Sequence, residues 1–180
     1  MSPTLSFPGP RPVAELQKKV RIRTTKGDIV IQIDPEAGPN AASNFVYLVE
    51  QGFYQGTIFH RVIPGFMIQG GDPTGTGYGD PGYKIPDDPV RNLPQKDFRP
   101  YGVRPYYPKG LVAAARTPAP NSAGSQFFIM VADYPLDPSY AVFGHVIEGQ
   151  AVADAIAGVP RDEDDRPAEE IRMTSVSIEP

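Results

Sequence analysis

Short runs with the alternation of β-strands recur along most of this chain. Residues 20–24 and 28–33 alternate apolar and polar side chains, and Thr25-Lys26-Gly27 between them has the composition of a hairpin turn. Further strands are expected at residues 57–63, 66–70, 110–115, 126–131, 141–146 and 171–178. Helical spacing is present in residues 38–52 and 149–157. Many short strands with two isolated helices predict an all-β fold, a barrel whose ends are closed by the helices.

The composition argues against several classes of protein. A chain of 180 residues, 40% of them hydrophobic, is expected to form one domain with its own core. Because Cys is absent, we exclude a disulfide, a thiolate nucleophile and a zinc–thiolate site, and two His residues are too few to predict a metal site. The net charge of -4 argues against nucleic acid as a partner. No apolar run approaches the ~20 residues that span a bilayer, and residues 1–20 lack the apolar core of a signal peptide. We therefore expect a cytoplasmic protein that does not bind membranes.

Proline is concentrated in two segments. Four of the 22 prolines lie in residues 1–18, where we expect an extended N-terminal tail, followed by one domain over residues 19–180. Six more interrupt residues 85–110, so this segment is neither a central strand nor the interior of a helix. Its length predicts a packed or functional loop.

Two of the expected strands are apolar on both faces and carry very few polar side chains. In one, Gln126, Phe128 and Met130 share a face, while Phe127, Ile129 and Val131 share the other. The same alternation places Met67 with Gln69, and Phe66 with Ile68 on the opposite face. One face is expected to fill the core. The other face belongs either to a peptide-binding groove or to a second buried layer with a stray Gln.

Arg61 is the lone charged side chain in the apolar residues 58–63. A guanidinium is almost never fully buried without a partner, so Arg61 reaches solvent, pairs with a carboxylate or serves a chemical role. The string Gly77-Tyr78-Gly79-Asp80-Pro81-Gly82 matches the G-x-G-x-x-G fingerprint of dinucleotide sites. Prolines follow where that motif needs a helix to begin, so we interpret it as a turn and expect no cofactor.

These segments, read together, resemble one known family. The strings FHRVIPGFMIQGG at residues 59–71 and NSAGSQFFI at residues 121–129 are similar to the signature strands of the cyclophilin-type peptidyl-prolyl cis–trans isomerases, in a bacterial-like form. Shorter matches occur in family order at residues 25–29, 42–45, 52–54, 70–77 and 142–146. The resemblance covers residues 20–178. It implies an eight-stranded antiparallel β-barrel capped by two α-helices.

The resemblance also implies a set of site residues. It places the catalytic group on Arg61, with Gln69 and Phe128 beside it. It places the substrate-binding residues on Phe66, Met67, Gly75, Arg116, Thr117, Gln126, Leu136 and Tyr140. Many members carry Trp just before the Leu-Asp pair, whereas Pro135 precedes Leu136-Asp137 here and the chain has no Trp. We therefore expect weak binding of cyclosporin.

The resemblance implies an enzyme that accelerates rotation about Xaa-Pro bonds during protein folding, by a proline pocket and an Arg donor to the prolyl nitrogen. Its partners would be Pro-containing peptides and folding proteins, with the enzyme as a monomer. Two alternatives stay open at this point. One is a non-catalytic module that binds Pro-containing peptides, and the other is a barrel that holds a small apolar ligand inside.

Overall fold

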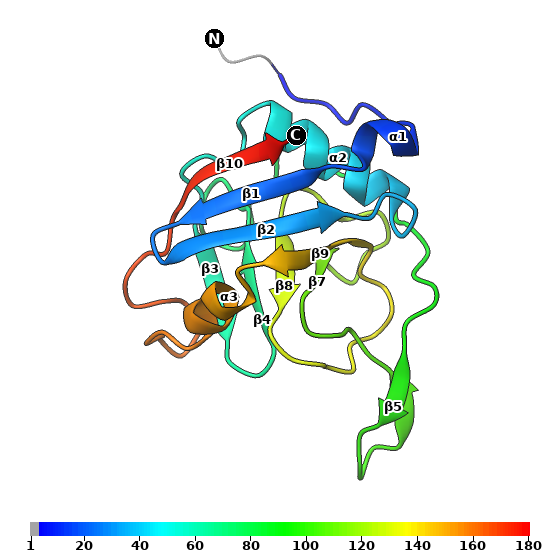
Figure 1. Ribbon diagram of the computed structural model, residues 1–180, viewed down its shortest axis with the longest axis vertical. Coiled ribbons are helices and arrows are strands. Elements are labelled where there is room, and N and C mark those ends of the chain that lie inside the picture. The colour runs from blue at the N-terminus through cyan, green and yellow to red at the C-terminus, as the bar shows by residue number, and fades with distance from the viewer. Residues whose placement is uncertain (1–3) are drawn as a thin grey trace.

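The computed structural model describes residues 4–180, in which eight strands form one antiparallel sheet with the order β10-β1-β2-β9-β7-β8-β4-β3 (Figure 1). The strands are β1 Lys19–Thr24, β2 Gly27–Ile33, β3 Phe59–Ile63, β4 Met67–Gly70, β7 Leu111–Ala114, β8 Phe127–Met130, β9 Val142–Glu148 and β10 Met173–Glu179. The sheet curls until its two edge strands, β3 and β10, approach each other. An isolated antiparallel bridge between Ile58 and Arg172, the residues just before these two strands, joins the edges. The predicted eight-stranded antiparallel barrel is confirmed.

Two helices pack on this barrel where the sequence predicts them. Helix α2 (Pro39–Glu50) begins with Pro at its first turn, and the Asp88 carboxylate accepts hydrogen bonds from the amides of Asn40 at 3.0 Å and Ala41 at 2.8 Å. Helix α3 (Gln150–Ala157) follows Gly149, whose φ of 87° and close approach to the Asp28 carbonyl leave no room for a side chain. Within residues 4–180, no helix is long and apolar enough to cross a bilayer.

The buried side chains form two clusters, one on each face of the strands β4, β7 and β8. The barrel core lies inside and includes Phe45, Phe59, Ile68, Phe127 and Ile129. The outer cluster lies on the opposite face and consists of Met67, Tyr107, Ala113, Phe128, Met130 and Val142. The strands are thus apolar on both sides because each side faces a cluster. A void bordered by Phe45, Tyr54 and Phe127 measures about 10 Å³, which argues against an apolar ligand inside the barrel.

The Pro-rich segment 85–110 contains a β-hairpin, where the sequence predicts only a loop. Strands β5 (Gln95–Asp97) and β6 (Val103–Pro105) pair only with each other and extend away from the barrel (Figure 1). The ammonium of Lys96 lies over the rings of Phe98 and Tyr106 and pairs with Asp133 at 2.7 Å. The buried residues Asp88 and Tyr107 anchor the segment on either side of the hairpin.

The N-terminal segment, which we expected to be extended, ends in the one-turn helix α1 (Val13–Leu16) beside α2 (Figure 1). The Leu16 side chain is fully buried, and Leu5 and Phe7 pack against the barrel core. The Arg11 amide donates to Ser43 Oγ at 2.9 Å, and its guanidinium pairs with Glu50 at 2.6 Å. Burial of these apolar side chains explains why the segment lies on the barrel despite its prolines.

Candidate active site

Arg61 and Gln69 lie opposite each other on the adjacent strands β3 and β4. Phe59 pairs with Gly70 but Arg61 pairs with Gln69, so His60 forms a bulge in β3. Beyond the bulge, Arg61 is exposed, while Phe59 and Val62 are fully buried in the barrel core. Among the residues that the structure describes, no hydrogen bond or ion pair holds the Arg61 guanidinium. Its donors are therefore free to reach a bound molecule.

His60, next to Arg61, lies buried beneath this surface. Burial lowers the pKa of its imidazole, so the ring is neutral at pH 7. Its Nδ1 atom has no hydrogen-bond partner within residues 4–180. His60 thus adds no second positive charge beside Arg61.

Arg61 borders a cavity of about 190 Å³ with both apolar and polar lining residues, which we call the proline pocket. The lining residues are Arg61, Phe66, Met67, Gln69, Ala115, Arg116, Phe128, Leu136 and Tyr140. They come from β3, β4 and the turn between them, from β8, from the residues that follow β7 and from the segment that leads into β9. Every one of them except Ala115 was expected at the site from the sequence. Ala115 ends the predicted strand 110–115, and its small side chain gave no signal of its own.

Phe66 lines the pocket, although strand alternation predicts that it points to the opposite face of the sheet. Strict alternation assigns Phe66 to the face opposite Met67, but Phe66 packs against the outer cluster that contains Met67, and both residues line the pocket. Strand β4 begins only at Met67, and Phe66 lies in the preceding turn after Gly65, whose φ is 74°. The turn frees Phe66 from the strand period, and its ring stacks on Tyr134 at 4.1 Å between centroids.

A second cavity of about 170 Å³ adjoins the proline pocket and shares Gln69, Ala115 and Arg116 with it. Thr117 and Gln126 line this second cavity, so the predicted residues divide between two neighbouring hollows. The Gln69 amide donates to Gln126 Oε1 at 2.9 Å. The Gln126 amide in turn donates to the carbonyls of Gly77 and Gly79, both at 3.0 Å. These bonds fix both Gln side chains at the junction of the two cavities.

Gly75 borders neither cavity. Its carbonyl accepts a hydrogen bond from Arg166 at 2.8 Å, and its Cα faces the Ile58 side chain. Gly75 therefore lies in the same loop as Gly77 and Gly79, but only Gly77 and Gly79 line the second cavity.

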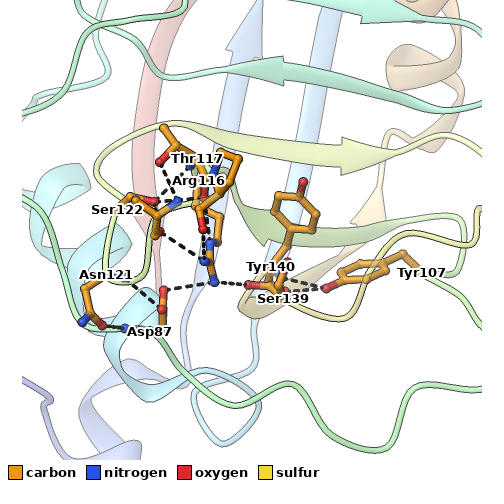
Figure 2. Close-up of polar contacts among 10 residues, drawn as sticks. Asp87, Tyr107, Arg116, Thr117, Asn121, Ser122, Ser139 and Tyr140 are labelled. Carbon is orange, nitrogen blue, oxygen red and sulfur yellow. Dashed lines mark hydrogen bonds and ion pairs between the residues drawn. The ribbon is translucent and has the colours of Figure 1, made fainter.

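The Arg116 guanidinium is turned toward the protein. It donates to the main-chain carbonyls of Thr117 at 3.1 Å, Ala119 at 3.1 Å and Ser139 at 3.2 Å (Figure 2). It also lies 3.4 Å from the Asp87 carboxylate. Arg116 thus lines both cavities while its charged end joins three loops.

A larger cavity lies elsewhere, between residues 34–39, residues 88–94 and the strands β7 and β9. It measures about 700 Å³ and contains none of the residues expected at the site. We assign the candidate active site to the smaller proline pocket because it combines an unpaired cation with apolar walls. Within residues 4–180, no cluster of three or more His, Cys, Asp or Glu side chains is placed to hold a metal ion.

The fold is an antiparallel barrel with an exposed arginine beside a small cavity, and comparisons with known proteins assign it to a family. The model of the cyclophilin type peptidyl-prolyl cis-trans isomerase/CLD family matches residues 19–178. The chain belongs to this family and is a peptidyl-prolyl cis–trans isomerase.

Individual relatives agree with this assignment. Peptidyl-prolyl cis-trans isomerase-like 3 of Rhizopus delemar is 42% identical over 170 residues, covering 88% of this chain and 93% of the relative. CYP65 of Arabidopsis thaliana is 41% identical over 160 residues, and this chain spans 25% of its length. A crystal structure of a Cryptosporidium parvum cyclophilin superposes with a TM-score of 0.79 at 34% identity, covering 91% and 98% of the two chains. Peptidyl-prolyl cis-trans isomerase A of Mycobacterium tuberculosis is 39% identical over 175 residues, covering 87% of this chain and 90% of the relative. Because relatives of similar identity occur in eukaryotes and in bacteria, the comparisons do not bear out a specifically bacterial-like form.

Proposed function

We propose that the chain isomerises Xaa-Pro bonds in the proline pocket, with Arg61 as the donor to the prolyl nitrogen. The observation that carries this proposal is the exposed Arg61 guanidinium, unpaired among the described residues, at the edge of a cavity of about 190 Å³ whose lining includes the side chains of Phe66, Met67, Phe128 and Leu136. Pockets for drug-sized ligands measure roughly 300–1,000 Å³, so this cavity suits a single small ring such as that of proline.

The chemistry requires one well-placed donor. An amide resists rotation by about 18–20 kcal/mol because its nitrogen shares a lone pair with the carbonyl group. In the twisted transition state this conjugation is lost, and the nitrogen becomes basic. A donor aimed at that nitrogen binds the twisted form more tightly than either planar form, which lowers the barrier without a covalent step. Arginine suits the role because it stays protonated and offers several N–H groups.

The remaining residues of the site hold the peptide. Phe66, Met67, Phe128 and Leu136 enclose the proline ring, and Tyr140 borders it. We assign Gln69 and Gln126 to the peptide main chain on the side of the second cavity. This assignment is supported by the bonds that fix their amide groups where the two cavities join. A solved structure of the Cryptosporidium parvum relative, determined in the presence of the dipeptide Ala-Pro, is consistent with a site of this kind.

The energetic requirement is moderate. Uncatalysed exchange takes roughly 10–100 s, so a turnover near 10³ s⁻¹ needs a barrier lower by about 5–7 kcal/mol. One preorganised donor supplies about 3–4 kcal/mol. Ordering of the peptide across two cavities supplies the rest. The partners are Pro-containing peptides and folding proteins.

Replacing Arg61 tests the proposal. We expect Arg61→Ala to lower kcat/KM for a short Xaa-Pro peptide about 10²–10³-fold, as the loss of one preorganised donor does elsewhere. Exchange NMR on the peptide measures the rate, and circular dichroism checks that the variant is folded. Arg23→Ala is the matched control, because Arg23 is an arginine of β1 with a side chain 64% exposed and lines neither cavity.

The outcomes separate the proposal from its main alternative. Full activity in a folded Arg61→Ala variant would show that Arg61 is not the donor. A wild-type protein that binds the peptide without accelerating exchange would leave only a binding module for Pro-containing segments.

A further inference from the structure

Tyr107 lies behind the proline pocket rather than in it. Its side chain is fully buried in the outer cluster, and it is absent from the lining of both cavities. It belongs to the Pro-rich segment 85–110, far in sequence from the pocket residues it contacts. No feature of the sequence singled it out.

Tyr107 contacts both ends of the pocket-wall segment, which we define as residues 134–140. Its backbone pairs with Tyr134 through two hydrogen bonds, of 2.9 and 3.1 Å. At the other end, its hydroxyl donates to the Tyr140 carbonyl at 2.7 Å and accepts from the Tyr140 amide at 3.1 Å (Figure 2). Tyr107 therefore binds both ends of the segment that places Leu136 and Tyr140 in the pocket wall.

Within residues 4–180, few other hydrogen bonds hold the pocket-wall segment in position. It contains Pro135 and Pro138, which have no amide to donate, and it forms no strand. The bonds within it are short turns, from Leu136 to Tyr134 and from Ser139 to Asp137. Among the described residues, the other hydrogen bond at its far end is that from Arg116 to the Ser139 carbonyl (Figure 2). The position of the wall thus depends on Tyr107 and Arg116.

The Tyr107 ring also contacts the pocket from behind. Its centroid lies 6.3 Å from Phe128 and 6.3 Å from Tyr140, and those two rings meet edge to face at 5.4 Å. Tyr134, which Tyr107 holds by its backbone, stacks on Phe66. Tyr107 is therefore linked, directly or through residues 134–140, to four residues of the pocket lining: Phe66, Phe128, Leu136 and Tyr140.

We propose that Tyr107 is a positioning residue of the isomerase, holding residues 134–140 in the place where they complete the proline pocket. This inference rests on the proposed function of the pocket and extends it to a residue that does not touch the substrate. Burial raises the pKa of the Tyr107 hydroxyl, so the group stays protonated and keeps donating throughout the physiological pH range.

The proposal predicts a specific kinetic effect. Without the hydroxyl, the wall occupies its correct position for only part of the time, and the apparent affinity for peptide falls by that fraction. Bound peptide restores the closed wall, so turnover at saturation is kept. The hydroxyl makes two hydrogen bonds to Tyr140, and since one ordinary hydrogen bond shifts such an equilibrium about fivefold, the loss of both shifts it about 25-fold toward the displaced wall. For a wall whose closed position is favoured about fivefold in the wild-type protein, we expect Tyr107→Phe to raise KM roughly three- to tenfold. The change in kcat is expected to be less than about twofold.

The experiment compares Tyr107→Phe with Ile22→Val in the full chain. Tyr107→Phe keeps the ring and its packing, while Ile22→Val removes one buried methyl group from β1, which lines neither cavity. NMR exchange at several peptide concentrations gives kcat and KM. Hydrogen exchange by mass spectrometry is expected to show faster exchange in residues 134–140 for Tyr107→Phe, with α2 unchanged.

The possible results decide the question. A rise in KM with kcat retained, together with faster exchange confined to residues 134–140, supports the proposal. Unchanged KM, or the same pattern as Ile22→Val, overturns it.

Two outcomes need a separate reading: a Tyr107→Phe variant that does not fold, and a wild-type protein without activity. If Tyr107→Phe does not fold, Asp133→Ala decides instead, because Asp133 accepts the Lys109 amide at 2.9 Å at the start of the wall. A KM raised about twofold then supports positioning, and an unchanged KM refutes it. A wild-type protein with no isomerase activity would refute the proposed function, whereas the exchange rates still test the Tyr107 contacts.

Discussion

Phe127 and Phe128 are consecutive residues of β8 that belong to different clusters. Phe127 is 1% exposed and meets the rings of Phe45 and Tyr54 edge to face in the barrel core. Phe128 faces the outer cluster and the proline pocket. Phe127 therefore packs in the barrel core, and its neighbour Phe128 lines the proposed binding site.

This division predicts different effects of the same substitution. Phe127→Ala is expected to lower the free energy of unfolding by about 3–5 kcal/mol, because it leaves a cavity among aromatic rings. Phe128→Ala is expected to raise KM for a Xaa-Pro peptide, because it removes a wall of the pocket. Urea denaturation and peptide kinetics measure the two effects. Exchanged results, with the larger KM effect at Phe127, would contradict the assignment of faces.

At the scale of elements, the loop after β4 is organised around one carboxylate. Asp72 is 1% exposed and accepts hydrogen bonds from the amides of Thr74 at 2.7 Å, Gly77 at 2.6 Å and Gly79 at 3.0 Å. Burial alone would raise the pKa of Asp72, but these amides and the Thr74 hydroxyl lower it to about 2. The carbonyls of Gly77 and Gly79 are thereby held where Gln126 binds them.

The depressed pKa of Asp72 gives a prediction with a definite sign. Because the folded state binds the ionised form, the stabilisation is present above the ordinary pKa of 3.8 and disappears as the pH falls through about 2. We expect Asp72→Asn to lower the free energy of unfolding by about 2 kcal/mol at pH 7, with the difference narrowing between pH 4 and pH 2. Urea denaturation across this range measures it, with exposed Asp164→Asn as control. A difference that is constant with pH would refute the role of the charge.

The β5–β6 hairpin is the other element whose role can be tested. Its strands cover no edge of the large sheet, since β5 and β6 pair only with each other. Tyr101 is 72% exposed and Val103 is 68% exposed, so the tip adds little to the core.

Replacement of residues 95–105 by a short Gly-Ser linker keeps both Asp88 and Tyr107. We expect the free energy of unfolding to change by less than about 1 kcal/mol, and kcat/KM for a short peptide to stay within about twofold. Refolding assays with a Pro-limited protein substrate then show whether the hairpin influences the choice of client. A variant that unfolds would show instead that the hairpin is a structural cover.

At the scale of the whole molecule, the N-terminal segment contributes to stability without reaching the site. Leu16 is fully buried, whereas no residue between 4 and 18 lines the proline pocket or the second cavity. Deletion of residues 1–16 is expected to lower the free energy of unfolding by roughly 2–5 kcal/mol, the effect of losing a buried Leu. Under conditions where the shortened protein is folded, kcat/KM is expected to be unchanged. Unchanged stability, or a loss of activity in the folded protein, would contradict this division.

The sequence by itself determined the features that depend on local periodicity. Alternation along residues 126–131 separated Gln126 and Phe128 from Phe127, because successive strand residues point to opposite faces whatever the strand pairs with. The spacing of apolar residues located α2 and α3, and the family resemblance supplied all but one of the residues that line the proline pocket.

Only the tertiary structure decided what depends on contacts between distant segments. It resolved the conflict between strand alternation, which assigns Phe66 to the face opposite Met67, and the family resemblance, which assigns Phe66 to the pocket, because a turn rather than a strand carries that residue. It turned the Arg116 guanidinium toward Ser139 and Asp87, which lie 23 and 29 residues away in the sequence. It also brought Tyr107 behind the pocket wall, 33 residues before the Tyr140 backbone that it binds. Such partners are selected by strand order and packing across the whole chain, and no local pattern of residue types records them.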